Sequence, residues 1–547
     1  MKQLLQEMKD LLSQKIYTVA LIITAFCGYG FSVTHYSIGI DDTAVSLYLV
    51  DGLEVEMGRW VMYLLNKVFF IGEFAPFVTE LLAVVFLILA GTVFCVLFKR
   101  ILGERMGVVP CTLFSCVFVS YPLIATVFVY YFHNGAGLAY LITALALLCY
   151  NSFMEKEGKE RYKSLLYSAL FVWVAAGCYE SFLVLYILGV LAIVFLRGLY
   201  DKNKLSSGFV IKSLLCGALA VVVSMILRTI MLAIVIALFQ IDAPDTVLGL
   251  RSISEMSVLF SEEGLQNTWM LVKRFWLLYH VNALVFLPIT GYELACFVAG
   301  IYAVIALVKK KNLWYPLLFG GMLLVPLLLT IIEAKVTFYR SCQYLPFFTA
   351  FGVLLLFLGF ERQRFAKHYR MLITFVGIVL IYNQATQLNR NFYTDYRQYE
   401  LAKETMLGIA YDVERQFGTE TPIVLVGSDD IPYEFIKHYY VPYDSWQYKA
   451  IAAITDPVDE HLKEKYFQPE GYCFIGELNL PMIRWGFDAF DGTNRELIRF
   501  LEMHGYSFTT ITDKAILDEA RKLGNEMPAW PREGSITMQD GYVLIHL

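Results

Sequence analysis

Eleven long apolar segments run through the first 388 residues of the chain and constrain its fold more than any other feature. A helix needs about 20 mainly apolar residues to cross a hydrocarbon core about 30 Å thick, and all but one of the segments approach that length. We therefore expect an α-helical polytopic membrane protein with about 11 transmembrane helices. The predicted segments are 16–34, 75–98, 107–131, 135–153, 164–177, 179–197, 211–239, 283–307, 313–332, 343–360 and 371–388.

Composition supports the lipid bilayer as the solvent of this chain. Of its 547 residues, 58% are hydrophobic and only 17% are charged, against about 25% charged residues in an ordinary soluble domain. The net charge is −5 and no basic stripe is present, so nucleic acid is excluded as a partner. The ten cysteines form no CxxC pair and are interpreted as small apolar core residues.

The loops between the segments alternate in their content of Lys and Arg. Cytoplasmic loops carry the excess of these residues, so the N-terminus is expected inside and the C-terminal region outside a bacterial cytoplasmic (inner) membrane. The short segment 164–177 meets the next one at Gly177–Glu180, and a broken or re-entrant helix is an alternative there. The cation-rich loops hold Lys2, Lys9, Lys15, Lys99, Arg100, Arg105, Lys156, Lys159, Arg161, Lys163, Arg197, Lys202, Lys204, Lys309, Lys310, Lys311, Arg362, Arg364, Lys367 and Arg370.

Composition changes near Asn389, where charged and turn residues increase and apolar runs shorten to strand length. We expect a membrane domain at 1–388 and a small α/β extracytoplasmic domain at 389–547. Its Trp446, Trp485 and Trp530 are candidate platforms for sugar rings or members of a packed core. The pattern predicts strands at 421–427 and 541–546 and helices at 395–417 and 494–504.

Adjacent carboxylates, Asp41 and Asp42, stand out in the first predicted outer loop. Like charges this close raise the pKa of one carboxyl group, as a general base requires. Oxygen ligands of this kind also bind a divalent cation such as Mg or Mn. The third interpretation is a hydrated acidic loop or a helix cap.

Cations recur on the same outer side at Arg59, Lys335 and Arg340. A guanidinium group held at a membrane boundary suits the phosphate of a lipid-linked substrate, because it bonds two oxygens at once. Two ionisable residues, Glu180 and Arg228, lie in or beside apolar segments, where such residues are costly and usually paired or functional. For Arg228 the options are a carboxylate partner, a lipid phosphate, or bracing of two helices.

Motifs for ATP hydrolysis, zinc proteolysis, serine hydrolysis and dinucleotide binding are absent from the sequence. The energy for any reaction is therefore expected to come with the substrate.

The outer-loop residues together resemble the bacterial O-antigen glucosyltransferase family of the Gtr type-II kind. The resemblance lies in Asp41–Asp42, Gly58–Trp60, Tyr179–Glu180, Tyr339–Arg340 and the polytopic layout with a polar C-terminal tail. It covers most of the membrane region. The chain departs from the family at Tyr179–Glu180, where family members tend to have Tyr-Gln.

The resemblance implies a C-type glycosyltransferase that uses a polyprenyl-phosphate-linked sugar donor and a cell-surface glycan acceptor. It assigns the general base to Asp42, with Asp41 as its partner or as a metal ligand, and it implies inversion at the anomeric carbon. Substrate contacts are then expected from Arg59, Glu180, Lys335 and Arg340. The alternative function is a lipid-linked saccharide flippase or polysaccharide exporter, and a third is a glycan polymerase.

Overall fold

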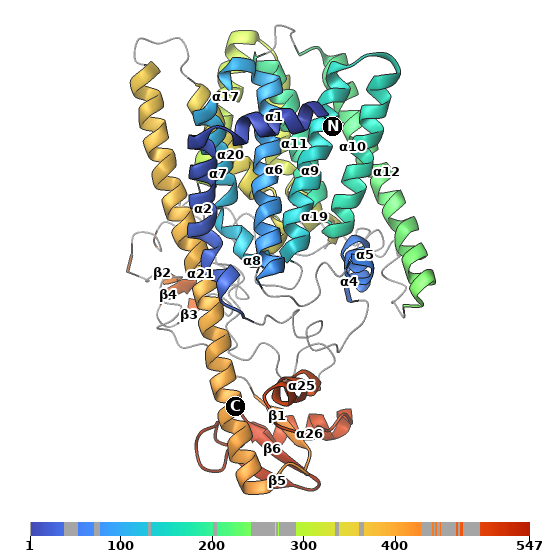
Figure 1. Cartoon of the computed structure of the whole chain (residues 1–547), viewed down its shortest axis with the longest axis vertical. Helices are drawn as coiled ribbons and strands as arrows, with labels where there is room; N and C mark the ends of the chain where they lie inside the picture. Colours follow the sequence, from blue (N-terminus) through green and yellow to red (C-terminus); the bar gives the residue numbers. More distant parts are fainter. Residues whose placement is uncertain are drawn as a thin grey trace.

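The structure is a computed structural model of the whole chain. It describes residues 2–37, 53–69, 77–128, 133–200, 205–241, 269, 272, 291–333, 339–359, 366–427, 440–441, 444–445, 449, 467–468, 471–473 and 493–547. A bundle of roughly parallel and antiparallel helices makes up the larger part, and a small group of strands and helices lies beyond one end of it (Figure 1).

The bundle is built from helices of very different length. Its elements, in chain order, are α1 (Lys2–Leu12), α2 (Lys15–Thr34), α4 (Leu53–Glu56), α5 (Trp60–Phe69), α6 (Val78–Leu102), η1 (Gly103–Arg105), α7 (Val108–Val119), η2 (Pro122–Ile124), α8 (Ala125–Phe128), α9 (His133–Glu155), α10 (Gly158–Cys178), α11 (Phe182–Tyr200), α12 (Ser207–Phe239), α17 (Tyr292–Lys310), α18 (Trp314–Leu324), α19 (Leu327–Glu333), η5 (Tyr339–Ser341), α20 (Leu345–Leu358) and α21 (Ala366–Phe417).

Eight helices in the described part of the chain are long and apolar enough to cross a membrane, and α18 and α20 are shorter apolar helices. This finding confirms a polytopic membrane protein. Helix α10 is continuous from Gly158 to Cys178, and α11 begins after a junction of three residues, so these are two separate helices rather than one broken helix.

Small residues and aromatic rings determine how closely the spanning helices pack. A side chain on Gly137 of α9 would collide with the backbone of Ala83 on α6, and one on Gly352 of α20 would collide with Ala295 on α17. Such contacts let the helix backbones approach closely. Close packing of this kind holds membrane helices together, because lipid is as apolar as their side chains and the hydrophobic effect does not drive them to associate. A cluster of rings fills the space between α6, α7 and α20: Phe94, Phe98, Phe114, Phe118, Phe347 and Phe351.

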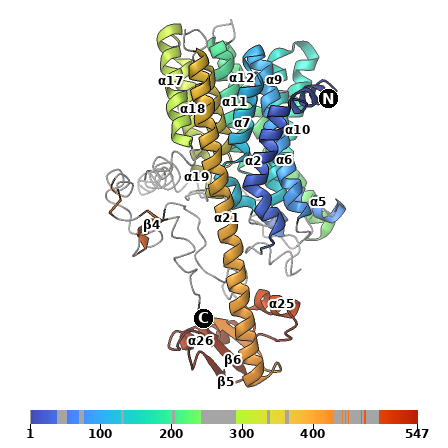
Figure 2. The same ribbon diagram turned by 60° about the vertical axis from the view of Figure 1, so that its left-hand side comes forward.

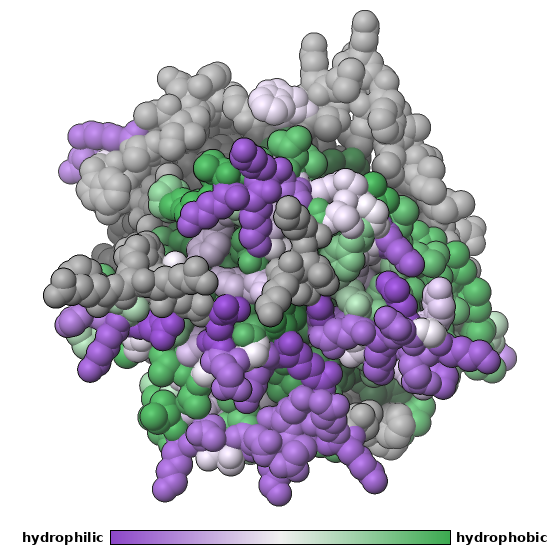
Figure 3. Space-filling view, turned by 90° about the horizontal axis from the view of Figure 1, so that it is seen from above, coloured by the Kyte–Doolittle hydropathy of each residue, from purple (hydrophilic) through white to green (hydrophobic). Residues whose placement is uncertain are grey.

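Basic side chains gather at one end of the bundle, which we call the cationic end. It contains the last turns of α6, α11 and α17, with Lys99, Arg100, Arg197, Lys309 and Lys310, and it lies opposite the C-terminal strands (Figure 1). Viewed from above, this end shows hydrophilic side chains beside apolar ones (Figure 3).

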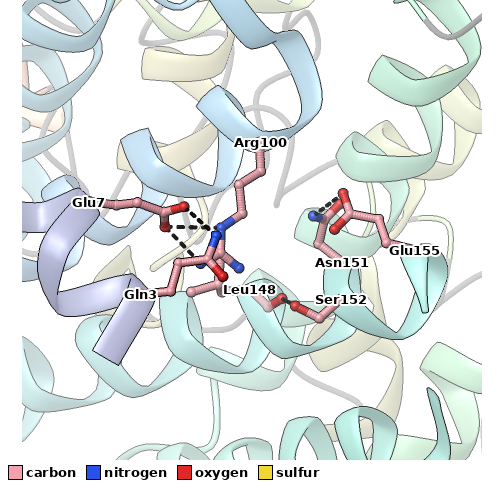
Figure 4. Close-up of polar contacts among 7 residues, drawn as sticks. All are labelled: Gln3, Glu7, Arg100, Leu148, Asn151, Ser152 and Glu155. Carbon is pink, nitrogen blue, oxygen red and sulfur yellow. Dashed lines mark hydrogen bonds and ion pairs between the residues drawn. The ribbon is translucent and has the colours of Figure 1, made fainter. Parts of the chain in front are cut away.

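Helix α1 lies across the cationic end and is joined to α6 by an ion pair. Arg100 donates from Nε and Nη2 to Glu7 Oε2, at 3.1 and 2.7 Å. On the neighbouring α9, Asn151 donates to Glu155 at 3.1 Å (Figure 4). Arg197 of α11 donates to both of these residues.

Helix α21 connects the bundle to the C-terminal region. Its 52 residues span about 78 Å at 1.5 Å per residue, far more than a bilayer core. Its second half continues past the bundle to the C-terminal strands (Figure 2). The domain boundary predicted at 388/389 falls inside this single helix, and the division into two domains stays a prediction.

The C-terminal strands form two small sheets. In the first, β1 (Ile423–Val426) pairs in parallel with β6 (Tyr542–His546), which pairs antiparallel with β5 (Ile536–Gln539). The short strands β2 (Tyr440–Val441), β4 (Gly471–Cys473) and β3 (Phe467–Gln468) form the second, in that order. Two further helices are α25 (Arg495–Met503) and α26 (Lys514–Gly524).

The predicted strands at 421–427 and 541–546 are confirmed as β1 and β6, and the predicted helix at 494–504 as α25. Trp530 packs against Gly408 of α21 and donates to Asp412 Oδ2 at 3.3 Å. This contact favours the packing interpretation of that tryptophan. Trp446 and Trp485 lie outside the described residues.

Candidate active site

The candidate site lies at the end of the bundle that faces the C-terminal strands, and it begins with the turn between α4 and α5. Gly58 has a φ of 75°, which favours glycine. Its N–H donates to Val55 O at 2.8 Å, and the N–H of Arg59 donates to Glu54 O at 2.7 Å. The Arg59 carbonyl then accepts from Met62 N at 3.0 Å, so the turn follows α4 and leads directly into α5, which begins at Trp60.

The turn packs against the junction between α10 and α11. The guanidinium group of Arg59 lies over the Tyr179 ring, 4.5 Å from its centroid, in cation–π geometry. Trp60 stacks on Trp173 of α10 with 4.8 Å between ring centroids. A Cβ on Gly177 would be 2.6 Å from Trp60 Cε2, so the absent side chain is what admits the indole.

An ion pair joins this junction to α12. Glu180 Oε1 accepts from Arg228 Nη2. Of the three interpretations of Arg228, the structure therefore supports pairing with a carboxylate. The Arg228 side chain is 9% exposed and that of Glu180 is 44% exposed. The pair therefore has one buried member inside the bundle and one member open to the surface.

Gly58 supports this ion pair through its lack of a side chain. A Cβ at this position would be 2.9 Å from Arg228 Cζ and 3.2 Å from Glu180 Oε1. The Gly58–Trp60 turn and the Tyr179–Glu180 junction, which are far apart in the sequence, thus form one polar cluster with Arg228. Of the predicted substrate-binding residues, this cluster brings together Arg59 and Glu180.

A buried carboxylate just before the Gly58–Trp60 turn, Glu54, was not selected from the sequence as a site residue. Glu54 is buried, and its Oε1 accepts from Asn66 Nδ2 at 2.6 Å. The contact joins α4 to α5 across twelve residues. A lone Asn in an apolar helix gives no sequence signal of such a partner.

Arg340 lies in η5, which packs on η2 and α8. Its carbonyl accepts from Gln343 Nε2, and Tyr140 OH donates to Gln343 Oε1 at 2.6 Å. The Tyr140 ring meets Phe182 edge-on at 4.7 Å, and Phe182 meets Tyr179 at 6.3 Å. A continuous row of contacts therefore links the Arg340 segment to the ring beneath Arg59.

Three predicted site residues, Asp41, Asp42 and Lys335, lie outside the described residues. Within the described ranges, no group of three or more His, Cys, Asp or Glu side chains is arranged to hold a metal ion. The predicted divalent cation at Asp41 and Asp42 therefore stays a prediction.

Comparison with known protein families identifies the chain. A family model described as Glucosyl transferase GtrII matches residues 30–357, more than half of the sequence. The chain belongs to this family. The resemblance expected from the outer-loop residues is thus confirmed, and the protein is a membrane glycosyltransferase. No curated protein and no solved structure matches the chain.

The matched residues of this GtrII member include the whole candidate site. They begin within α2 and end within α20, so they cover the α4–α5 turn, the α10–α11 junction, Arg228 and Arg340. Helices α1 and α21 and the C-terminal sheets lie outside the match.

Proposed function

We propose that this GtrII member transfers a hexose, with glucose as the first candidate, from a polyprenyl-phosphate sugar to a cell-surface polysaccharide. The observation that carries the proposal is the cluster of Arg59, Tyr179, Glu180 and Arg228. It lies within the family-matched residues, at the end of the bundle opposite the cationic end. Side chains of the kinds that can bind sugar and phosphate thus lie together at one end of the bundle, which supports the proposal.

The proposed orientation follows from the cationic end. Excess Lys and Arg marks the cytoplasmic side, so α1 lies inside, and the candidate site and the C-terminal sheets lie outside the cytoplasmic membrane. Eleven crossings fit this arrangement: the eight long apolar helices, α10, the α18–α19 pair, and α20. The region 389–547 is then an extracytoplasmic domain suited to holding the acceptor glycan.

The proposed chemistry is a direct displacement at the anomeric carbon. The acceptor hydroxyl oxygen attacks that carbon, its proton passes to Asp42, and the bond from the sugar to the polyprenyl phosphate breaks with inversion. The leaving phosphate gains negative charge. In this proposal the charge is stabilised by three cations, Arg59, Lys335 and Arg340. Asp41 acts as the partner of Asp42 or as a ligand for Mg or Mn.

Transfer of labelled sugar from polyprenyl-phosphate donors to endogenous glycan tests the proposal. Membranes containing wild type, Asp42→Asn or Arg340→Ala are compared at equal amounts of inserted protein. We expect Asp42→Asn to lose roughly 100-fold or more in rate, as the loss of a general base predicts. Addition of EDTA to wild type and to Asp41→Asn separates the two roles of Asp41, since only a metal ligand makes the rate depend on added Mg or Mn.

The second candidate function, a flippase or exporter of lipid-linked saccharides, requires a polar path through the bundle and alternating access. The cluster at one end of the bundle and the family membership both favour the enzyme. Movement of lipid-linked saccharide across the membrane without transfer from any donor would reverse that preference.

A further inference from the structure

The Glu180–Arg228 ion pair leaves part of the Glu180 carboxylate open. Its Oε1 accepts from Arg228 Nη2, and no other hydrogen bond or ion pair of this carboxylate is found within the described residues. The Glu180 side chain is 44% exposed. An ionised carboxylate has about four positions for accepting hydrogen bonds on its two oxygens. Glu180 therefore keeps unused acceptor capacity at the surface of the candidate site.

The position of this carboxylate is fixed from two sides. At the backbone, the Glu180 carbonyl accepts from Leu183 N at 3.0 Å as α11 begins. At the side chain, the guanidinium group of Arg228 is buried and lies against Gly58, where a Cβ would be 2.9 Å from Arg228 Cζ. A guanidinium group enclosed in this way has little room to move. The second oxygen of the carboxylate, Oε2, thus has a defined place.

The pair is not needed to hold its helices together. Helix α12 already packs closely on α11, since a Cβ on Gly217 would be 3.0 Å from Val190 Cγ1. It is also joined to α9, because Tyr150 OH donates to Ser213 O at 2.7 Å. Two apolar side chains would connect these elements without removing a cation from water. An ion pair with one open member is better explained by a ligand for that member.

Hydrogen-bond donors around the pair also have unmet capacity. Trp60 Nε1, Ser181 Oγ and Arg228 Nε are buried and have no hydrogen-bond partner within the described part of the chain. Trp60 lies against the same junction, because a Cβ on Gly177 would be 2.4 Å from its Nε1. Nearly all buried polar atoms in proteins have a partner, so each exception calls for an explanation such as a water molecule or a ligand. The cluster therefore combines an open acceptor with several donors.

A sugar hydroxyl matches this combination, because it donates one hydrogen bond and accepts others. A phosphate is repelled by the Glu180 carboxylate and is left to cations such as Arg59, which lies over the neighbouring Tyr179 ring. A divalent cation prefers several oxygen ligands, and the described residues contain no group of three acidic, His or Cys side chains arranged to hold one. The hydroxyl group of a sugar is thus the ligand chemistry that the open oxygen favours.

We propose that Glu180 binds a sugar hydroxyl group through Oε2, and that Arg228 is the positioning residue that holds Oε1. This inference rests on the proposed function and names a subsite of it. A charged group that accepts from a substrate hydroxyl discriminates against sugars that lack this hydroxyl, because the carboxylate then loses its partner. The pair therefore helps to determine which sugar is bound.

The test compares glucose and its monodeoxy forms, each lacking one hydroxyl, as polyprenyl-phosphate donors. For each variant in membranes, kcat/KM with glucose is divided by kcat/KM with each deoxy sugar. This ratio does not depend on the amount of inserted protein, so a loss of folding alone leaves it unchanged. In wild type we expect the ratio for one hydroxyl to be about 10 to 100, as for a hydrogen bond to a charged group.

Removal of the carboxylate should abolish this discrimination. In Glu180→Ala we expect the ratio for the same hydroxyl to fall to within about threefold of one, because two losses are not additive when they remove one contact. Glu180→Gln keeps an oxygen for Arg228 and serves where Glu180→Ala does not insert, and its ratio should fall too. Arg228→Met leaves the carboxylate present but no longer held, and should lower the ratio at least about threefold.

Arg197 and Glu155 form a matched control pair at the cationic end. Their side chains are 14% and 39% exposed, close to the values for the Glu180–Arg228 pair, and Glu155 lies on α9 (Figure 4). Glu155→Ala should keep the wild-type ratio for every hydroxyl. A similar change of ratio in Glu155→Ala and Glu180→Ala would show a general effect of breaking an ion pair, and would overturn the subsite.

The hydroxyl belongs either to the donor hexose or to a sugar of the acceptor glycan, and a second measurement separates the two. An acceptor hydroxyl leaves the donor ratios unchanged and instead raises the KM for isolated endogenous glycan at least about tenfold in Glu180→Ala and Arg228→Met, but not in Glu155→Ala. The inference is overturned if neither the donor ratios nor the acceptor KM change in Glu180→Ala. Absence of transfer by wild type with every donor would instead overturn the proposed function, and this inference with it.

Discussion

At the residue scale, the Glu180–Arg228 pair is asymmetric, because one member is buried and the other is half exposed. Glu180 is left with an exposed carboxylate when its partner is removed, whereas Arg228 without Glu180 is a cation that stays buried. Truncation of one partner of a buried pair is costly mainly because the other charge remains buried. Substitution of Glu180 alone and of Arg228 alone should therefore lower the free energy of unfolding by different amounts.

We expect Glu180→Gln to lower the free energy of unfolding more than Arg228→Met does, by about 1–3 kcal/mol against less than about 1 kcal/mol. Thermal denaturation in detergent, followed by a fluorescent thiol probe or by light scattering, measures the difference. The double variant should resemble Arg228→Met. Equal losses of unfolding free energy in the two single variants would show that the difference in exposure between Glu180 and Arg228 does not determine their effects on stability.

Gly58 combines a left-handed backbone with direct contact to this ion pair. Gly58→Ala should cost about 1–2 kcal/mol for the backbone and displace Arg228 as well, with at least a tenfold loss of transfer. Gly418 is a matched control, since its φ is also 75° and a Cβ there meets nothing within 4 Å. Gly418→Ala should show the backbone cost and retain transfer, and equal loss of transfer in both variants would contradict this account.

At the scale of elements, contacts between segments far apart in the sequence position the α10–α11 junction and strand β1. The α10–α11 junction is positioned by the α4–α5 turn and by α12, and strand β1 depends on a side chain from the segment before α25. Asn494 is fully buried, accepts from Leu425 N at 2.8 Å and donates to Leu425 O at 3.2 Å. It thus pairs with β1 as a neighbouring strand would.

Asn494→Ala leaves both backbone groups of Leu425 without these partners, and each buried unpaired group costs about 1–3 kcal/mol. We expect the C-terminal region to become sensitive to limited proteolysis while the membrane helices stay protected. Asn525→Ala, at an exposed position after α26, is the control and should behave as wild type. Equal protease resistance of Asn494→Ala and Asn525→Ala would show that the two hydrogen bonds contribute little.

At the scale of the whole molecule, the two ends of the bundle differ in charge and in what they carry. One end bears α1 and the last turns of α6, α11 and α17, and the other bears the candidate site and, through α21, the C-terminal sheets. This polarity agrees with the proposed function, in which a lipid-linked donor and an acceptor glycan meet on the outer side of the membrane.

We expect alkaline phosphatase fused after Leu547 to be active, since this reporter folds only outside the cytoplasm, and the same reporter inserted at 156–163 to be inactive. A green fluorescent protein at the same two places should give the opposite pattern. The physical basis is the excess of Lys and Arg on the cytoplasmic side. Activity of the phosphatase at 156–163 would reverse the proposed orientation.

The sequence alone determined the membrane class, the family and the principal C-terminal elements β1, β6 and α25. These properties depend on local signals: the length of apolar runs, strand-length apolar stretches, and short motifs such as Gly58–Trp60. Local patterns also placed Arg59 and Glu180 among the candidate residues. What they leave open is which distant groups meet.

Tertiary structure decided the partners. The pairing of Glu180 with Arg228, of Glu54 with Asn66, and of Ser37 with Asp395 joins residues 48, 12 and 358 positions apart. No periodicity encodes such contacts, because they arise from helix crossings fixed by packing at glycines and aromatic rings. The continuous α21 was also decided at this level, since its apolar half enters the bundle while its polar half is stabilised by the C-terminal core.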